Sequence, residues 1–84
     1  MPTVFIPSAL RPFADGHESV EVAGSTVREV VNNLDPALRA ELLEGAKLKP
    51  NLAVAVDGAV APMGLLERVD PDSEIHFIAA ISGG

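Results

Sequence analysis

Cysteine is absent from this chain of 84 residues, and so are tryptophan and tyrosine. Without a thiol, the chain has no disulfide, no sulfur-ligated zinc or iron–sulfur cluster, and no cysteine nucleophile. Because the only aromatic residues are three phenylalanines, we expect valine, leucine, isoleucine and alanine to build the core.

Basic residues are also few, since 6 lysines and arginines stand against 12 acidic residues, for a formal net charge of −6. This balance argues against a nucleic-acid partner, because contacts to phosphates need clustered lysine and arginine. The charge indicates either a basic groove on a partner protein or a role in solubility alone. There is no apolar run of membrane-spanning length and no signal-peptide pattern. We therefore expect a cytoplasmic protein with no membrane partner.

The length and the hydrophobic content of 48% are typical of one small folded domain. We place this domain at residues 1–81 and a flexible Ser-Gly-Gly tail at residues 82–84. A domain of this size leaves little room for a catalytic cleft.

The first half of the chain predicts two strands followed by a helix. Residues 3–6 and 17–22 have strand character, and the loop between them, residues 8–16, ends in an Asp-Gly turn. The helix is expected to begin at Thr26, where a capping box with Glu29 would satisfy both backbone donors. Its buried stripe follows the helical spacing and consists of Val27, Val30, Val31 and Leu34.

A short second helix is predicted next. Asp35 is its expected N-cap, Pro36 its first residue and Gly45 its end. Leucines 38 and 42 anchor it to the core, and residues 47–50 form a connecting loop whose lysines are expected to be solvated.

Three strands complete the predicted fold. They lie at residues 51–56, 59–61 and 74–80, and an Asp57-Gly58 hairpin turn joins the first two. Leu65, Leu66 and Val69 are expected to cap one end of the core. The element order predicts an α+β domain of the β-grasp, ubiquitin-like type, with a mixed sheet of about five strands packed on one main helix plus the short second helix.

No group of side chains has the spacing of a catalytic or metal site. His17 and His76 lie far apart, each on the polar side of an alternating strand, so both are predicted to be surface residues. The acidic residues at 70, 72 and 74 lack the central glycine and the final glutamate of a calcium loop. We therefore expect no catalytic residue, no metal and no bound cofactor.

The chemistry is expected at Ser82-Gly83-Gly84, which follows the apolar stretch 75–81. Two glycines without Cβ atoms allow such a tail to extend and to pass through a narrow channel. A terminal carboxylate is ionised at neutral pH and acylates poorly. It could be activated by attack on the α-phosphate of ATP, but the chain has no phosphate-binding loop. A partner enzyme must then supply the ATP site.

The outward side of the sheet is predicted to dock this partner, since clustered exposed apolar residues mark interfaces. The alternative is that loop 8–16 or the second helix covers this face. The residues expected to form the docking surface are Phe5, Ile78, Ala53, Ala55 and Ala80.

Over essentially its whole length the chain resembles the ubiquitin-like sulfur carriers of the MoaD and ThiS type. The resemblance lies in the β-grasp order, the helix start at Gly24-Ser25-Thr26-Val27, the Asp57-Gly58 turn and the final Ser82-Gly83-Gly84. Residues 6–13, Ile-Pro-Ser-Ala-Leu-Arg-Pro-Phe, most resemble the CysO carriers of cysteine synthesis.

The resemblance implies a protein cosubstrate rather than an enzyme. Gly84 would carry the adenylate and then the thiocarboxylate, while Gly83 and Ser82 thread the channel of a ubiquitin-activating-type adenylyltransferase and sulfurtransferase that uses ATP. In the cysteine branch, the thiocarboxylate attacks an aminoacrylate bound to pyridoxal phosphate (PLP) in a sulfur-accepting synthase. A metalloprotease then releases cysteine.

Other functions stay open at this point. The carrier could supply molybdopterin, thiamin, a thiolated tRNA or a secondary metabolite. It could instead be a protein modifier joined through Gly84 to lysines of target proteins, or a plain β-grasp interaction module with an incidental tail.

Overall fold

The structure is a computed structural model, which describes residues 1–79. Its elements in chain order are β1 (Thr3–Phe5), η1 (Ser8–Ala14), β2 (Ser19–Glu21), α1 (Val27–Asn32), α2 (Pro36–Leu42), β3 (Leu43–Glu44), β4 (Lys47–Leu48), β5 (Leu52–Val56), β6 (Ala59–Val60), η2 (Gly64–Leu66) and β7 (Glu74–Ala79).

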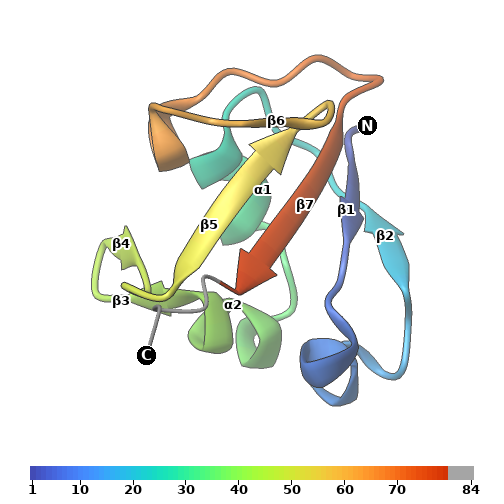
Figure 1. Ribbon diagram of the computed structural model, residues 1–84. Helices are drawn as coiled ribbons and strands as arrows, with labels where there is room; N and C mark the ends of the chain where they lie inside the picture. Colours follow the sequence, from blue (N-terminus) through green and yellow to red (C-terminus); the bar gives the residue numbers. More distant parts are fainter. Residues whose placement is uncertain (80–84) are drawn as a thin grey trace.

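Five of the strands form one mixed sheet in the order β2-β1-β7-β5-β6 (Figure 1). β1 pairs antiparallel with β2 and parallel with β7, and β5 pairs antiparallel with both β7 and β6. The first and last strands of the domain thus lie side by side at the centre of the sheet. This is the predicted β-grasp arrangement, and the α+β fold class is confirmed.

The core lies between one face of the sheet and the helices, and it is aliphatic as expected. The predicted stripe is confirmed, because Val27, Val30 and Val31 on α1 are buried, and so is Leu34, which lies just beyond the end of this helix. Complete burial of one such side chain stabilises the fold by about 1.5 to 3 kcal/mol. The sheet contributes Val4, Val54, Ile75 and Phe77 to the same cluster, and α2 contributes Leu38 and Leu42.

The start of α1 differs in one detail from the predicted capping box. Thr26 is the N-cap, and its hydroxyl accepts a hydrogen bond from the Glu29 N–H at 3.2 Å. The Glu29 carboxylate, however, accepts from the N–H and the hydroxyl of Ser25, both at 2.9 Å, rather than from the Thr26 N–H. Ser25 offers two donors to one oxygen, which the single Thr26 N–H cannot match.

These bonds make the stability of the domain depend on the ionisation of Glu29. The Ser25 N–H, and secondly its hydroxyl, hold the pKa of Glu29 below the ordinary value of 4.5. Because the folded pKa is the lower one, the ionised carboxylate stabilises the fold above the unfolded-state pKa, and this contribution is lost as pH falls through the folded pKa.

We therefore expect Glu29→Gln to lower the thermal unfolding midpoint near neutral pH, and the difference from the natural protein to shrink as the solution is acidified through this pKa. Calorimetry across a pH series checks this. Glu21→Gln on β2 is the control with the same charge change, because no hydrogen bond to the Glu21 carboxylate is found within residues 1–79. An equal effect of Glu29→Gln at every pH would contradict the role of the charge.

α2 begins as predicted and ends differently. The Asp35 carboxylate accepts from the Ala37 N–H at 2.9 Å, and Pro36 opens the helix. The predicted end at Gly45 is wrong, because the helix stops at Leu42. Gly45 has a φ of +64° and lies in the turn of the β3–β4 hairpin. The predicted connecting loop therefore contains β4. Strands of two residues are too short for alternation to reveal them.

Two other expectations are corrected. The loop 8–16 contains the 3-10 helix η1, although its Asp15-Gly16 turn is present with φ of 54° and 79°. The second helix is not the shorter one, because α2 has 7 residues and α1 has 6. Within residues 1–79, no helix combines the length and the apolar character that a membrane crossing requires.

The Asp57-Gly58 turn is confirmed, and it also fastens the start of β7. Both residues have positive φ, 52° and 86°, as a two-residue hairpin turn requires. The Asp57 carboxylate accepts from the Ser73 hydroxyl at 3.1 Å and from the Glu74 N–H at 2.9 Å. These two hydrogen bonds fix the start of β7 against the Asp57-Gly58 turn.

Candidate functional site

Within residues 1–79, no helix covers the face of the sheet opposite α1 (Figure 1). Strand register places Phe5, His76, Ala55 and Val60 in one row across β1, β7, β5 and β6. Ala53 and Ile78 form the neighbouring row on β5 and β7. We call Phe5, Ala53, His76 and Ile78 the outer-face patch.

Most of the predicted docking residues lie in this patch. Ile78 is 46% exposed, and Phe5 and Ala53 are half-buried. Ala55 is only 6% exposed, so the expectation that it offers contact surface is wrong. Its small side chain lies between its register neighbours on β7 and β6, which limits solvent access. Ala80 lies outside the described residues and stays a prediction.

A stacked pair of rings was missed by the sequence analysis. The rings of Phe5 and His76 lie with centroids 4.4 Å apart and planes 1° apart. His76 is consequently half-buried rather than a plain surface residue, whereas His17 is exposed as predicted. The pair results from the parallel pairing of β1 with β7, which brings together residues from the two ends of the domain. The only sequence signal was that both residues occupy outward positions.

Charged residues lie at the edge of the patch, next to apolar ones. A depression beside the ring pair is lined by Phe5, Pro7, Arg11, Glu18 and His76, among others. Arg11 is held there because its Nε donates to the Ile6 carbonyl at 3.2 Å. Such a surface can bind the apolar surface of a partner and fix its orientation through charged groups.

The alternative was that loop 8–16 or the second helix covers the outward face of the sheet, and the structure does not show this. η1 packs against α2, and Ile78 stays exposed. Within the described part of the chain, no three histidine or acidic side chains form a group that could hold a metal ion.

The residues predicted to react, Ser82, Gly83 and Gly84, lie outside the described residues. Ile78 is six positions before Gly84 in the sequence. Six residues span at most about 20 Å when fully extended. A partner that docks on the patch therefore has to hold its reaction site within about that distance.

Comparison with known proteins places the chain. The model of the ThiS family matches residues 4–84. The chain belongs to the ThiS family. This ThiS-family protein is also similar to the structure of the Amycolatopsis orientalis BexX/CysO complex, with 29% identity over 100% of both chains and a TM-score of 0.90. No curated protein sequence matches it significantly.

Other solved structures share the fold of this ThiS-family protein. CysO of Mycobacterium tuberculosis is 24% identical, over 96% of this chain and 100% of that one, with a TM-score of 0.87. The small archaeal modifier protein 1 of Methanosarcina acetivorans is 23% identical, over 99% of this chain and 95% of that one, with a TM-score of 0.82.

The family confirms the resemblance seen in the sequence. It is a family of ubiquitin-like sulfur carriers, which are small carrier proteins. The Amycolatopsis structure is a complex of two proteins, so a partner surface has precedent among similar structures.

Proposed function

We propose that this ThiS-family protein carries sulfur as a thiocarboxylate at Gly84 and donates it in biosynthesis, with cysteine as the product. The observation that carries the proposal is the family match, which extends through Gly84. The choice of cysteine is supported by the similarity to the BexX/CysO structure over both full chains.

The proposed chemistry has two steps on one carboxyl group. A carboxylate oxygen of Gly84 attacks the α-phosphorus of ATP, and pyrophosphate leaves. Sulfide supplied by a donor then attacks the carbonyl carbon, and AMP leaves, which produces the thiocarboxylate. The sulfur is a softer nucleophile than the oxygen it replaces and stays anionic at neutral pH.

Other proteins supply every catalytic group in this proposal. A ubiquitin-activating-type enzyme binds ATP and docks on the outer-face patch, while Gly83 and Ser82 pass through its channel. A PLP-dependent synthase accepts the sulfur, and a metalloprotease releases the product. The carrier acts as a cosubstrate.

Mass spectrometry tests the first part of the proposal. After incubation with ATP, sulfide and the activating enzyme of the same organism, we expect the intact chain to gain the mass difference between sulfur and oxygen, located on Gly84. The chain without Gly84 is the matched control and should gain nothing. No gain on the full chain, or an equal gain on the shortened one, would overturn the proposal.

The pathway is tested with the loaded protein. Adding O-phosphoserine and a PLP-dependent synthase should produce a chain that carries cysteine at Gly84, whereas precursors of molybdopterin and thiamin should take up no sulfur. Transfer to one of those precursors instead would assign the carrier to another pathway. Conjugates with lysines of other proteins as the main product would favour a protein modifier.

A further inference from the structure

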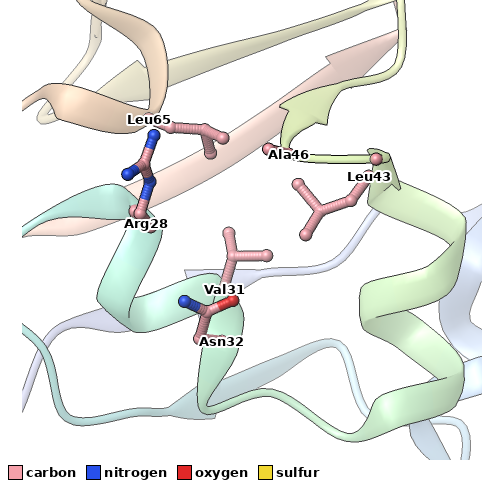
Figure 2. A pocket seen from close by; sticks show the side chains of 7 residues that line it. Arg28, Val31, Asn32, Leu43, Ala46 and Leu65 are labelled. Carbon is pink, nitrogen blue, oxygen red and sulfur yellow. The ribbon is translucent and has the colours of Figure 1, made fainter.

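A second surface feature lies on the helical side of the molecule, away from the outer-face patch. A cavity of about 180 Å³ opens between α1, the β3–β4 hairpin and η2. Figure 2 shows the side chains of Val31, Leu43, Ala46 and Leu65 directed towards one another, with Arg28 beside them. An adjoining depression shares Arg28, Ala46 and Leu65 and adds Lys47 and Leu66. We call the two together the helical-side groove.

Large apolar side chains are exposed at this groove. Leu66 was predicted to cap the core, but it is 58% exposed, and Met63 in the same depression is 59% exposed. The 3-10 helix η2 explains the error, because its tight turn directs Leu65 against the core and leaves Leu66 outside. Clustered exposed apolar residues of this kind mark interaction sites more often than isolated ones do.

The charge at the groove is opposite to that of the whole chain. The lining residues include two cations, Arg28 and Lys47, and no acidic residue, in a chain with a net charge of −6. Arg11 and Arg39 donate to backbone carbonyls, whereas Arg28 donates to no group within residues 1–79. A guanidinium at the edge of an apolar cavity is well suited to pair with a carboxylate.

The two cations do not contribute equally. Glu44 lies opposite Lys47 in the hairpin register, so a negatively charged residue is the cross-strand neighbour of this cation. Arg28 extends from the exposed side of α1, and its neighbour Glu29 is hydrogen-bonded to Ser25. Arg28 is therefore the main source of the positive field at the groove.

We propose that the helical-side groove docks a segment of a partner protein in which a leucine-like side chain lies next to a carboxylate. The apolar side chain would occupy the cavity between Val31, Leu43 and Leu65, and the carboxylate would pair with Arg28. Because the groove and the outer-face patch lie on different sides of the sheet, this partner can bind while the patch is occupied. The proposal does not depend on the sulfur chemistry.

NMR titration of the full, isotopically labelled chain tests the proposal with a defined probe. The probe is the acetylated, amidated peptide Asp-Leu-Leu-Asp, and the matched control peptide is Asn-Leu-Leu-Asn. We expect the acidic peptide to shift the signals of Val31, Ala46 and Leu65 and to bind about twofold to fivefold more tightly than the amide peptide, which is the range of one partly exposed ion pair.

Variants of the chain distinguish the contribution of charge to peptide binding from the contribution of the shape of the groove. Arg28→Gln should remove most of the preference for the acidic peptide, and Ala46→Trp should abolish binding of both peptides by filling the cavity. Lys47→Glu should weaken binding of the acidic peptide, whereas Lys49→Glu, two residues away and outside the groove, should not. Unchanged circular dichroism confirms that each variant is folded.

Several results would overturn the proposal. These are equal affinity for the two peptides, shifts confined to the outer-face patch, no shifts with either peptide, or groove shifts that depend on protein concentration alone. The last result would assign the groove to contact between two copies of the chain.

Discussion

Ile78→Arg is expected to reduce the rate of adenylation by the activating enzyme by about a hundredfold while the domain stays folded. Ile78 is 46% exposed in the outer-face patch, next to Ala53 in the sheet register. If this surface docks the enzyme, a guanidinium there would be buried against an apolar partner, and removal of a central interface residue alone lowers affinity by about 2 kcal/mol or more. Pyrophosphate release at low carrier concentration measures the effect.

Phe13→Arg provides the control for this experiment. Phe13 has a similar exposure, 39%, but lies on η1 outside the sheet, so we expect adenylation to stay within about twofold of the natural rate, as for a residue outside the interface. Phe5→Arg is also expected to block adenylation, but it removes the stack with His76 as well and therefore tests the patch less cleanly. Full adenylation of the folded Ile78→Arg protein would show that the enzyme docks elsewhere.

Gly24→Ala is expected to destabilise the domain by about 3 to 5 kcal/mol. Gly24 has φ of +154°, and a Cβ there would lie 2.7 Å from both the Cγ2 and the backbone nitrogen of Val30. Val30 is fully buried in α1, so neither atom has room to move. A domain of this size has a total stability of roughly 4 to 13 kcal/mol, so the variant would be at or near the limit of folding.

Urea denaturation measures this effect, and Gly16→Ala is the matched control. Gly16 also has a positive φ, +79°, but no atom lies within 4 Å of the added methyl group. Only the backbone strain remains there, and we expect a loss of about 1 kcal/mol. If the two variants lose equal stability, the contact with Val30 contributes nothing, and the backbone conformation alone explains the need for glycine.

Much of the fold follows from local patterns. The stripe on α1, the N-caps Thr26 and Asp35 and the Asp57-Gly58 turn are determined by interactions within a few residues, and the structure contains all of them. The same local patterns failed where an element is very short. The β3–β4 hairpin and the outward direction of Leu66 on η2 rest on two or three residues each, too few to show a period.

For the candidate site, the sequence by itself determined the family resemblance, the outward positions of Phe5 and Ile78 and the Ser-Gly-Gly ending at which we propose the chemistry. Only the tertiary structure decided that His76 stacks on Phe5, that Ala55 is buried and that Arg28 borders an apolar groove. The physical reason is that chain periodicity determines which face of an element a residue occupies. Its neighbours on that face come from strands and helices distant in sequence, and their register is set only when the whole core packs.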